Sequence, residues 1–132
     1  MIYKSLCLVI DVADPLSFLA HLQVRSVEQT TGSHVQRVPV ELRPPPAELI
    51  GADHPFWLQR WEQAEALAER LNLSLRKPCL VPWSRKAHEL LYHADAAGLD
   101  EAGELLDLIF QAFLLKGKDI GRVDILVGIG QS

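Results

Sequence analysis

The apolar and polar positions of the first 42 residues predict a strand, a helix and a second strand. Residues 2–10 (IYKSLCLVI) end in five consecutive apolar positions, a pattern typical of a strand buried on both faces, as in a parallel sheet. In residues 15–31 the apolar positions form two rows, which predicts a helix covered on more than one side; Gly32 marks its end. Residues 34–42 alternate apolar and polar with one slip. Pro39 places this second strand at a sheet edge, because proline has no N–H to donate to a neighbouring strand.

From residue 55 onward the pattern is helical. A proline-rich connector at residues 43–55 precedes a helix with one apolar stripe at helical spacing: Trp57, Trp61, Ala64, Ala68 and Leu71. After a predicted loop at residues 71–82, Ser84 and Asp100 stand where the caps of two further helices belong. Residues 121–132 predict a short last helix, weakened by glycines.

This layout belongs to the α/β class. A strand, a helix and a parallel strand form a βαβ unit, whose crossover is almost always right-handed. We expect residues 1–46 to form this βαβ part and residues 47–132 a helical part. The two should pack as one unit, since 132 residues leave room for about one hydrophobic core.

The start of the first helix is the stretch most relevant to function. In DVADPLSFLA, residues 11–20, Asp14 stands at the N-cap position, Pro15 at the first helical position and Ser17 one turn in. Proteins of the α/β class often bind ligands where a strand ends and a helix begins. Asp14 and Ser17 are therefore candidate catalytic residues. The interpretation we favour is a helix cap, with the serine bonded back to Asp14.

Four segments carry motifs in a characteristic order along the chain: Asp11-Val12-Ala13-Asp14-Pro15-Leu16-Ser17-Phe18-Leu19-Ala20, Val40-Glu41-Leu42-Arg43-Pro44, Ser84-Arg85-Lys86-Ala87-His88-Glu89-Leu90, and Leu108 to Leu126 with its Asp119-Ile120-Gly121. This ordered set resembles the DsbA-like branch of the thioredoxin superfamily. The most similar subgroup contains 2-hydroxychromene-2-carboxylate isomerases, kappa-class glutathione transferases and polyketide-pathway DsbA homologues. The resemblance implies a partial thioredoxin-like fold, with strands at about 2–10 and 34–42, followed by the family's helical domain.

Asp14 departs from the family pattern, which has Cys or Ser at the matching position. A helix N-terminus stabilises a thiolate there, and it stabilises a carboxylate in the same way, but a carboxylate cannot exchange with disulfides. Because no cysteine occupies position 14 or 17, dithiol–disulfide chemistry is excluded. By the resemblance, the hydroxyl of Ser17 would be left to donate to a bound thiolate.

The second departure concerns the C-terminal ββα half of the thioredoxin fold, which would follow Ser132. In the family the first strand, here residues 2–10, lies between the second and the third. Without the third strand, one edge of an apolar strand has no partner, which is an aggregation hazard unless it is covered. Either the chain is a fragment or another chain supplies the pairing. We predict a homodimer in which strand 2–10 pairs with its two-fold mate.

Four residues are candidates for binding a ligand near Asp14: Arg43, Trp83, Arg85 and His88. By the resemblance this ligand would be glutathione or a small aromatic carboxylate, held by the positive charge of the two arginines. Each residue also has a structural interpretation, which we favour. The arginines would pair with Glu41 or Asp53, and His88 would be partly buried and bonded to the backbone. By the resemblance, the half of the fold that would follow Ser132 also carries a cis-proline loop that holds the ligand beside the nucleophile, so half of the family's binding site would be missing.

Metal and thiol chemistry are not expected. The five histidines are scattered, and His88 and His93 are separated by five positions, whereas two ligands on one helix need a separation of three or four. Cys7 and Cys79 are not in a Cys-x-x-Cys pair and should be free thiols in a reducing compartment. We expect Cys7 to be buried in its strand and Cys79 to lie in a loop.

Composition limits the partners and the location. A net charge of −4 offers no basic surface for nucleic acid, and no apolar run approaches the about 20 residues of a membrane span. The N-terminus has no small-residue cleavage site, so we expect a cytoplasmic protein. The expected function is a non-redox, DsbA-like binding or assembly module without a cofactor. The alternative is an isomerase or transferase that binds glutathione or a small aromatic carboxylate.

Overall fold

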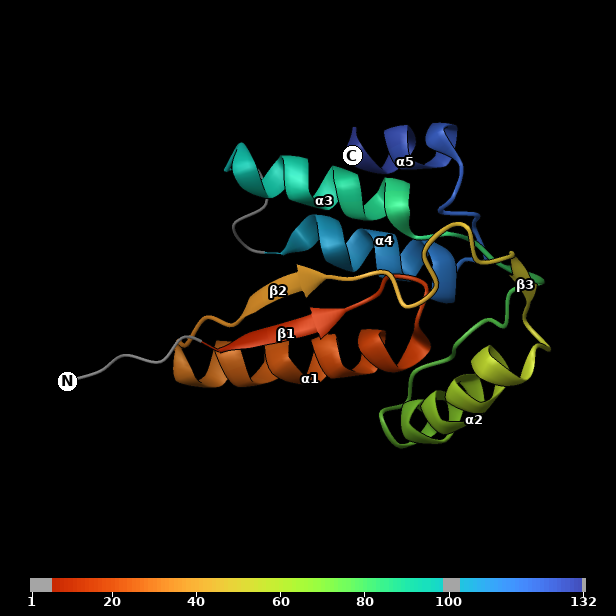
Figure 1. Cartoon of the computed structure of the whole chain (residues 1–132). Coiled ribbons are helices and arrows are strands. Elements are labelled where there is room, and N and C mark those ends of the chain that lie inside the picture. The colour runs from red at the N-terminus through yellow and green to blue at the C-terminus, as the bar shows by residue number, and fades with distance from the viewer. Residues whose placement is uncertain (1–5, 99–102, 132) are drawn as a thin grey trace.

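The computed structural model describes residues 6–98 and 103–131 and begins with the expected βαβ unit. Strand β1 (Cys7–Ile10) is followed by helix α1 (Pro15–Thr31) and by strand β2 (Gln36–Pro39). The two strands pair in parallel, with Val9 opposite Val38, and α1 runs along them (Figure 1). The predicted βαβ unit is confirmed, with shorter strands, and residues 2–5 lie outside the described residues.

The rest of the described chain is mainly helical. Its elements are β3 (Ile50–Gly51), α2 (Pro55–Arg70), β4 (Leu80–Val81), α3 (Arg85–Ala96), α4 (Glu104–Leu114) and α5 (Val123–Gly130). Figure 1 shows α3, α4 and α5 grouped together, with α3 and α5 packed against α4 and α3 also against β2, while α2 packs against α1. No helix of the described residues has the length and apolarity needed to cross a membrane.

Two short strands were not predicted. β3 and β4 form a small antiparallel pair inside segments that we expected to be an irregular connector and a loop. Strands of two residues leave no periodic pattern, so the sequence contains no signal for them. Ser84 precedes α3 as predicted, but its side chain makes no capping hydrogen bond. Asp100 lies outside the described residues, and α4 begins after Gly103.

The apolar strand β1 is covered on one face only. Leu8 and Ile10 point into the core, and Ile10 is 1% exposed, whereas the alternating side chains of Cys7 and Val9 are exposed. The prediction of a strand buried on both faces, with a buried Cys7, is therefore wrong. A continuous apolar run makes burial of both faces possible, but in the structure α1 and the core cover only the face that carries Leu8 and Ile10.

Aromatic side chains join the two predicted parts of the chain into one core. Phe18 of α1 stacks on Phe110 of α4 with ring centroids 5.2 Å apart. Trp57 and Trp61 of α2 stack at 5.3 Å, and Trp57 meets the edge of Phe113. Both tryptophans are almost fully buried, which confirms their expected packing role.

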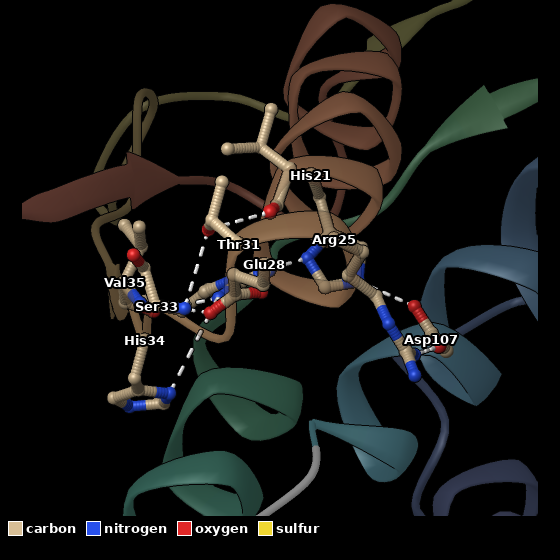
Figure 2. A network of polar contacts seen from close by, with 10 residues as sticks. His21, Arg25, Glu28, Thr31, Ser33, His34, Val35 and Asp107 are labelled. Carbon is tan, nitrogen blue, oxygen red and sulfur yellow. Dashed lines mark hydrogen bonds and ion pairs between the residues drawn. The ribbon is translucent and has the colours of Figure 1, made fainter.

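A network of charged groups ties α1 to β2 (Figure 2). The guanidinium of Arg37 donates to both carboxylate oxygens of Glu28, at 2.7 and 2.6 Å. The Val35 N–H donates to the same carboxylate at 2.7 Å. These contacts hold the C-terminal half of α1 against the start of β2.

The same network reaches α4 through a buried histidine. Arg37 Nε donates to Nδ1 of His21 at 3.2 Å, so the Nε2 of this neutral ring carries the proton and donates to Asp107 of α4. Arg25 forms an ion pair with the same Asp107. His21 is fully buried, and nothing in the local sequence pattern indicates this contact.

We predict that Glu28 makes the protein sensitive to acid. Its hydrogen bonds with Arg37 lower the pKa of Glu28 from 4.5 to about 2. A carboxyl group with a lowered folded-state pKa stabilises the fold above its unfolded pKa, and this contribution is lost as the pH falls from about 4.5 through about 2. The Glu28→Gln substitution should lower the free energy of unfolding at pH 7 by about 1.5–3 kcal/mol. Urea denaturation over this pH range measures both effects.

Glu65→Gln is the control, since Glu65 is exposed on α2 and should change the free energy of unfolding by less than about 0.5 kcal/mol. The difference between wild type and Glu28→Gln should shrink toward pH 2. A difference that stays constant between pH 7 and pH 2 would contradict the assignment to the Glu28 carboxylate.

Candidate functional site

Asp14 caps helix α1. Its backbone is extended, and its Oδ2 accepts hydrogen bonds from the Ser17 N–H at 3.1 Å and the Ser17 hydroxyl at 2.8 Å. Pro15 takes the first helical position. The predicted cap, with the serine bonded back to it, is confirmed.

The Asp14 carboxylate is also neutralised by a residue that the sequence analysis missed. Arg60 of α2 donates from two nitrogens to the two Asp14 oxygens, each at 2.7 Å. These hydrogen bonds raise the pKa of Arg60, while Asp14 is only 3% exposed. The available signal was its position on α2: three residues after Trp57, Arg60 lies beside the apolar stripe of this helix.

Asp11 organises the turn between β1 and α1. One of its carboxylate oxygens accepts from the Ala13 N–H at 2.9 Å, and the other from the Leu42 N–H at 2.8 Å. Its own N–H donates to the Ser17 hydroxyl at 3.1 Å. The Ser17 hydroxyl thus donates its single proton to Asp14 and accepts a hydrogen bond from the Asp11 N–H.

His88 and Trp57 bind the remaining peptide groups of this turn. The Val12 N–H donates to Nε2 of His88 at 3.1 Å, and the Trp57 indole donates to the Ala13 carbonyl at 2.8 Å. Burial lowers the pKa of His88, although nearby Asp11 opposes this shift. The predicted role of His88, a buried histidine bonded to backbone, is confirmed.

The two candidate arginines have partners within the chain. Arg85 of α3 forms an ion pair with Glu41 at 3.1 Å, as expected. Arg43 donates to the Glu48 carbonyl at 3.2 Å and lies over the Phe56 ring, 5.5 Å from its centre. Neither arginine approaches Asp14 closely enough to form an ion pair.

Trp83, a candidate for ligand binding, and Asp53 both lie in loops. Trp83 is 40% exposed and donates to the Ala47 carbonyl at 3.1 Å. Asp53, an expected partner of the arginines, instead pairs with Lys77 at 2.8 Å. Cys79 lies in a loop, as predicted, and is exposed.

The cavity beside Asp14 is small, with a volume of about 30 Å³. It is bordered by Asp14, Arg43 and Arg60 together with Asp11 and Phe56, but not by Ser17, Trp83, Arg85 or His88. A volume of this size holds about one water molecule, whereas sites for small ligands span roughly 300–1,000 Å³. The structure therefore gathers only Asp14 and Arg43 of the six candidate residues around one hollow.

Comparisons with known proteins find no relative. No family model matches the chain, and no curated protein or solved structure is similar enough to be matched with it. Within residues 6–98 and 103–131, no group of three or more His, Cys, Asp or Glu side chains is placed to hold a metal ion.

We predict that Arg60 stabilises the fold through Asp14. Removing one partner of a buried ion pair leaves an uncompensated charge, which costs about 3–5 kcal/mol. Because the Arg60 side chain is 36% exposed, we expect Arg60→Met to lower the free energy of unfolding by about 2–3 kcal/mol. Arg60→Lys should recover part of this loss. Urea denaturation measures the effect, and an unchanged midpoint in Arg60→Met would refute it.

We predict that His88 makes the protein less stable below neutral pH. Its folded-state pKa is lowered by burial, so the unfolded chain binds the proton more readily, and stability falls as the pH drops below the ordinary value of 6.5. His88→Gln offers an acceptor to Val12 without a titrating group. It should show a shallower loss of stability from pH 7 to pH 5, measured by thermal unfolding. An identical slope in both proteins would exclude His88 as the source.

Proposed function

We propose that this protein is a non-redox binding or assembly module, a degenerate relative of the DsbA-like family that self-associates through β1. The position of a thioredoxin-type active site, at the start of α1, is taken by a helix cap. Asp14 and Ser17 use their side-chain oxygens for hydrogen bonds within the chain, and His88 uses its Nε2 to accept from the Val12 N–H. This arrangement favours a structural role for the turn over catalysis.

The exposure of β1 is the observation that carries the proposal. Leu6, just before the strand, is 68% exposed and Val9 is 56% exposed. Among the described residues, β1 pairs with β2 on one edge and with no strand on the other. An apolar strand with an open edge is a template for pairing with another chain. A second copy related by a two-fold axis would extend the pair into a four-stranded sheet and bury Val9 of both copies.

The alternative function, an isomerase or transferase acting on glutathione or a small aromatic carboxylate, has less support. The cavity beside Asp14 is too small for either ligand, and the arginines assigned to them are engaged with Glu41, Glu48 and Phe56. Titration with glutathione separates the two functions: a ligand that binds only the folded state stabilises it by RT ln(1 + L/Kd), where L is the free ligand concentration, and so raises the melting temperature as its concentration rises, and we expect no shift.

We predict that Val9→Lys weakens self-association. The substitution removes apolar burial from both copies and places two like charges in the interface, so the dissociation constant of the dimer should rise by roughly tenfold or more. Sedimentation velocity over a concentration series measures this constant.

Val27→Lys is a matched control, because Val27 is also 56% exposed but lies on α1. It should leave the dissociation constant unchanged, and circular dichroism should report the same helix content in both variants. A wild-type protein that stays monomeric at every concentration, or equal weakening by the two substitutions, would overturn the proposed assembly through β1.

A further inference from the structure

A large hollow on the described surface lies away from Asp14, between β2 and α3. It has a volume of about 700 Å³ and is walled by β2, the C-terminal half of α1 and the facing ends of α3 and α4. Apolar side chains border it, among them Val38, Pro39, Leu91 and Leu106, and Asp95 also lines it. We call this hollow the β2 groove. Its volume is that of a binding site.

The outer edge of β2 faces the groove. The N–H groups of Gln36 and Val40 donate to the carbonyls of Leu6, just before β1, and of Ile10 at 3.1 and 2.8 Å. The N–H and carbonyl of Arg37 and the carbonyl of Pro39 therefore point away from β1. The Pro39 carbonyl accepts from the Tyr92 hydroxyl at 2.6 Å, which agrees with this direction.

Side chains form hydrogen bonds with the main chain of most residues along this edge but leave the main chain of one residue without a partner. The Val35 N–H is taken by Glu28, and the Val35 carbonyl accepts from the Arg37 guanidinium at 2.6 Å. Between Val35 and Pro39, the main-chain N–H and carbonyl of Arg37 have no partner within the described part of the chain. A donor and an acceptor from one strand residue match the backbone of an added strand.

The charges of the groove favour a basic occupant. Arg37 is neutralised by Glu28, and Arg25 by Asp107. Asp95 forms no ion pair with any described residue, although its carboxylate lines the groove. A carboxylate without an ionic partner among the described residues therefore lines the same hollow as the open edge of β2.

We propose that the β2 groove binds an extended peptide segment with a Lys or Arg side chain. The segment adds as a strand to the outer edge of β2, where its backbone exchanges hydrogen bonds with Arg37. An apolar side chain of the segment packs on Leu91 and Leu106, and the basic side chain lies near Asp95. This site is separate from the β1 edge and does not depend on self-association.

The test uses isotope-labelled protein and the peptide acetyl-Lys-Val-Lys-Val-Lys-amide. Titration should shift the backbone amide signal of Arg37 and leave that of Val9 unchanged. Replacing the lysines of the peptide by glutamates should weaken binding. Methylating two adjacent central nitrogens of the peptide should weaken binding about two- to tenfold, because at least one of them faces β2 and loses its hydrogen bond.

The matched protein variants are Asp95→Asn and Glu89→Gln, both on α3. Asp95→Asn should weaken binding by up to about fivefold, the range of an exposed ion pair, while Glu89 does not border the groove and its substitution should have no effect. No shift of Arg37 at millimolar peptide would overturn the proposal. Binding that is unaffected by backbone methylation would also overturn it, because it would indicate a ligand held by side chains alone. So would an Arg37 signal that moves with protein concentration in the absence of peptide, because it would indicate a second copy in the groove.

Discussion

The ion pair between Asp14 and Arg60 determines how the βαβ unit meets the helices that follow it. Asp14 begins α1, and Arg60 lies in the middle of α2, so two hydrogen bonds of 2.7 Å join these helices at a buried carboxylate. The Trp57 indole, one turn before Arg60, binds the Ala13 carbonyl of the same turn. The β1–α1 turn is therefore clamped from outside by α2 and from within by Asp11, and the aromatic core forms behind it.

This clamp also explains why the turn favours structure over chemistry. A group that reacts must present an atom with an unused lone pair or proton to a substrate. At this turn both oxygens of Asp14 are engaged with Arg60, and one of them with Ser17 as well. His88 uses its Nε2 lone pair to accept from the Val12 N–H. Hydrogen-bond donors that stabilise a carboxylate at this position would also stabilise a thiolate. The environment therefore suits an anion, and in this chain that anion is the Asp14 carboxylate, which caps the helix.

Sequence reasoning succeeded where the signals are local. Asp14, Pro15 and Gly32 lie within or beside α1, and the predicted helix, 15–31, coincides with the observed Pro15–Thr31. The site's key contact could not be predicted, because Arg60 lies 46 positions from Asp14 and no local pattern joins them. The exposure of Val9 was also beyond the sequence, since an apolar run does not reveal whether a second layer covers it. β3 and β4 are too short to produce a pattern.

The two outer edges of the β1–β2 pair are treated differently. On the β2 side, Glu28 and the Arg37 guanidinium satisfy the peptide groups of Val35, and the Tyr92 hydroxyl binds Pro39, so side chains occupy all but one residue of the edge. Soluble proteins commonly protect edges with charges and proline in this way. On the β1 side, the strand Cys7–Ile10 has neither charge nor proline, and Val9 is exposed beside the open edge. Within the part of the chain that the structure describes, side chains protect the β2 edge while the apolar β1 edge has no partner strand, and such an edge is suited to pairing. This asymmetry favours β1 as the edge for assembly and restricts β2 to the narrower contact available at Arg37.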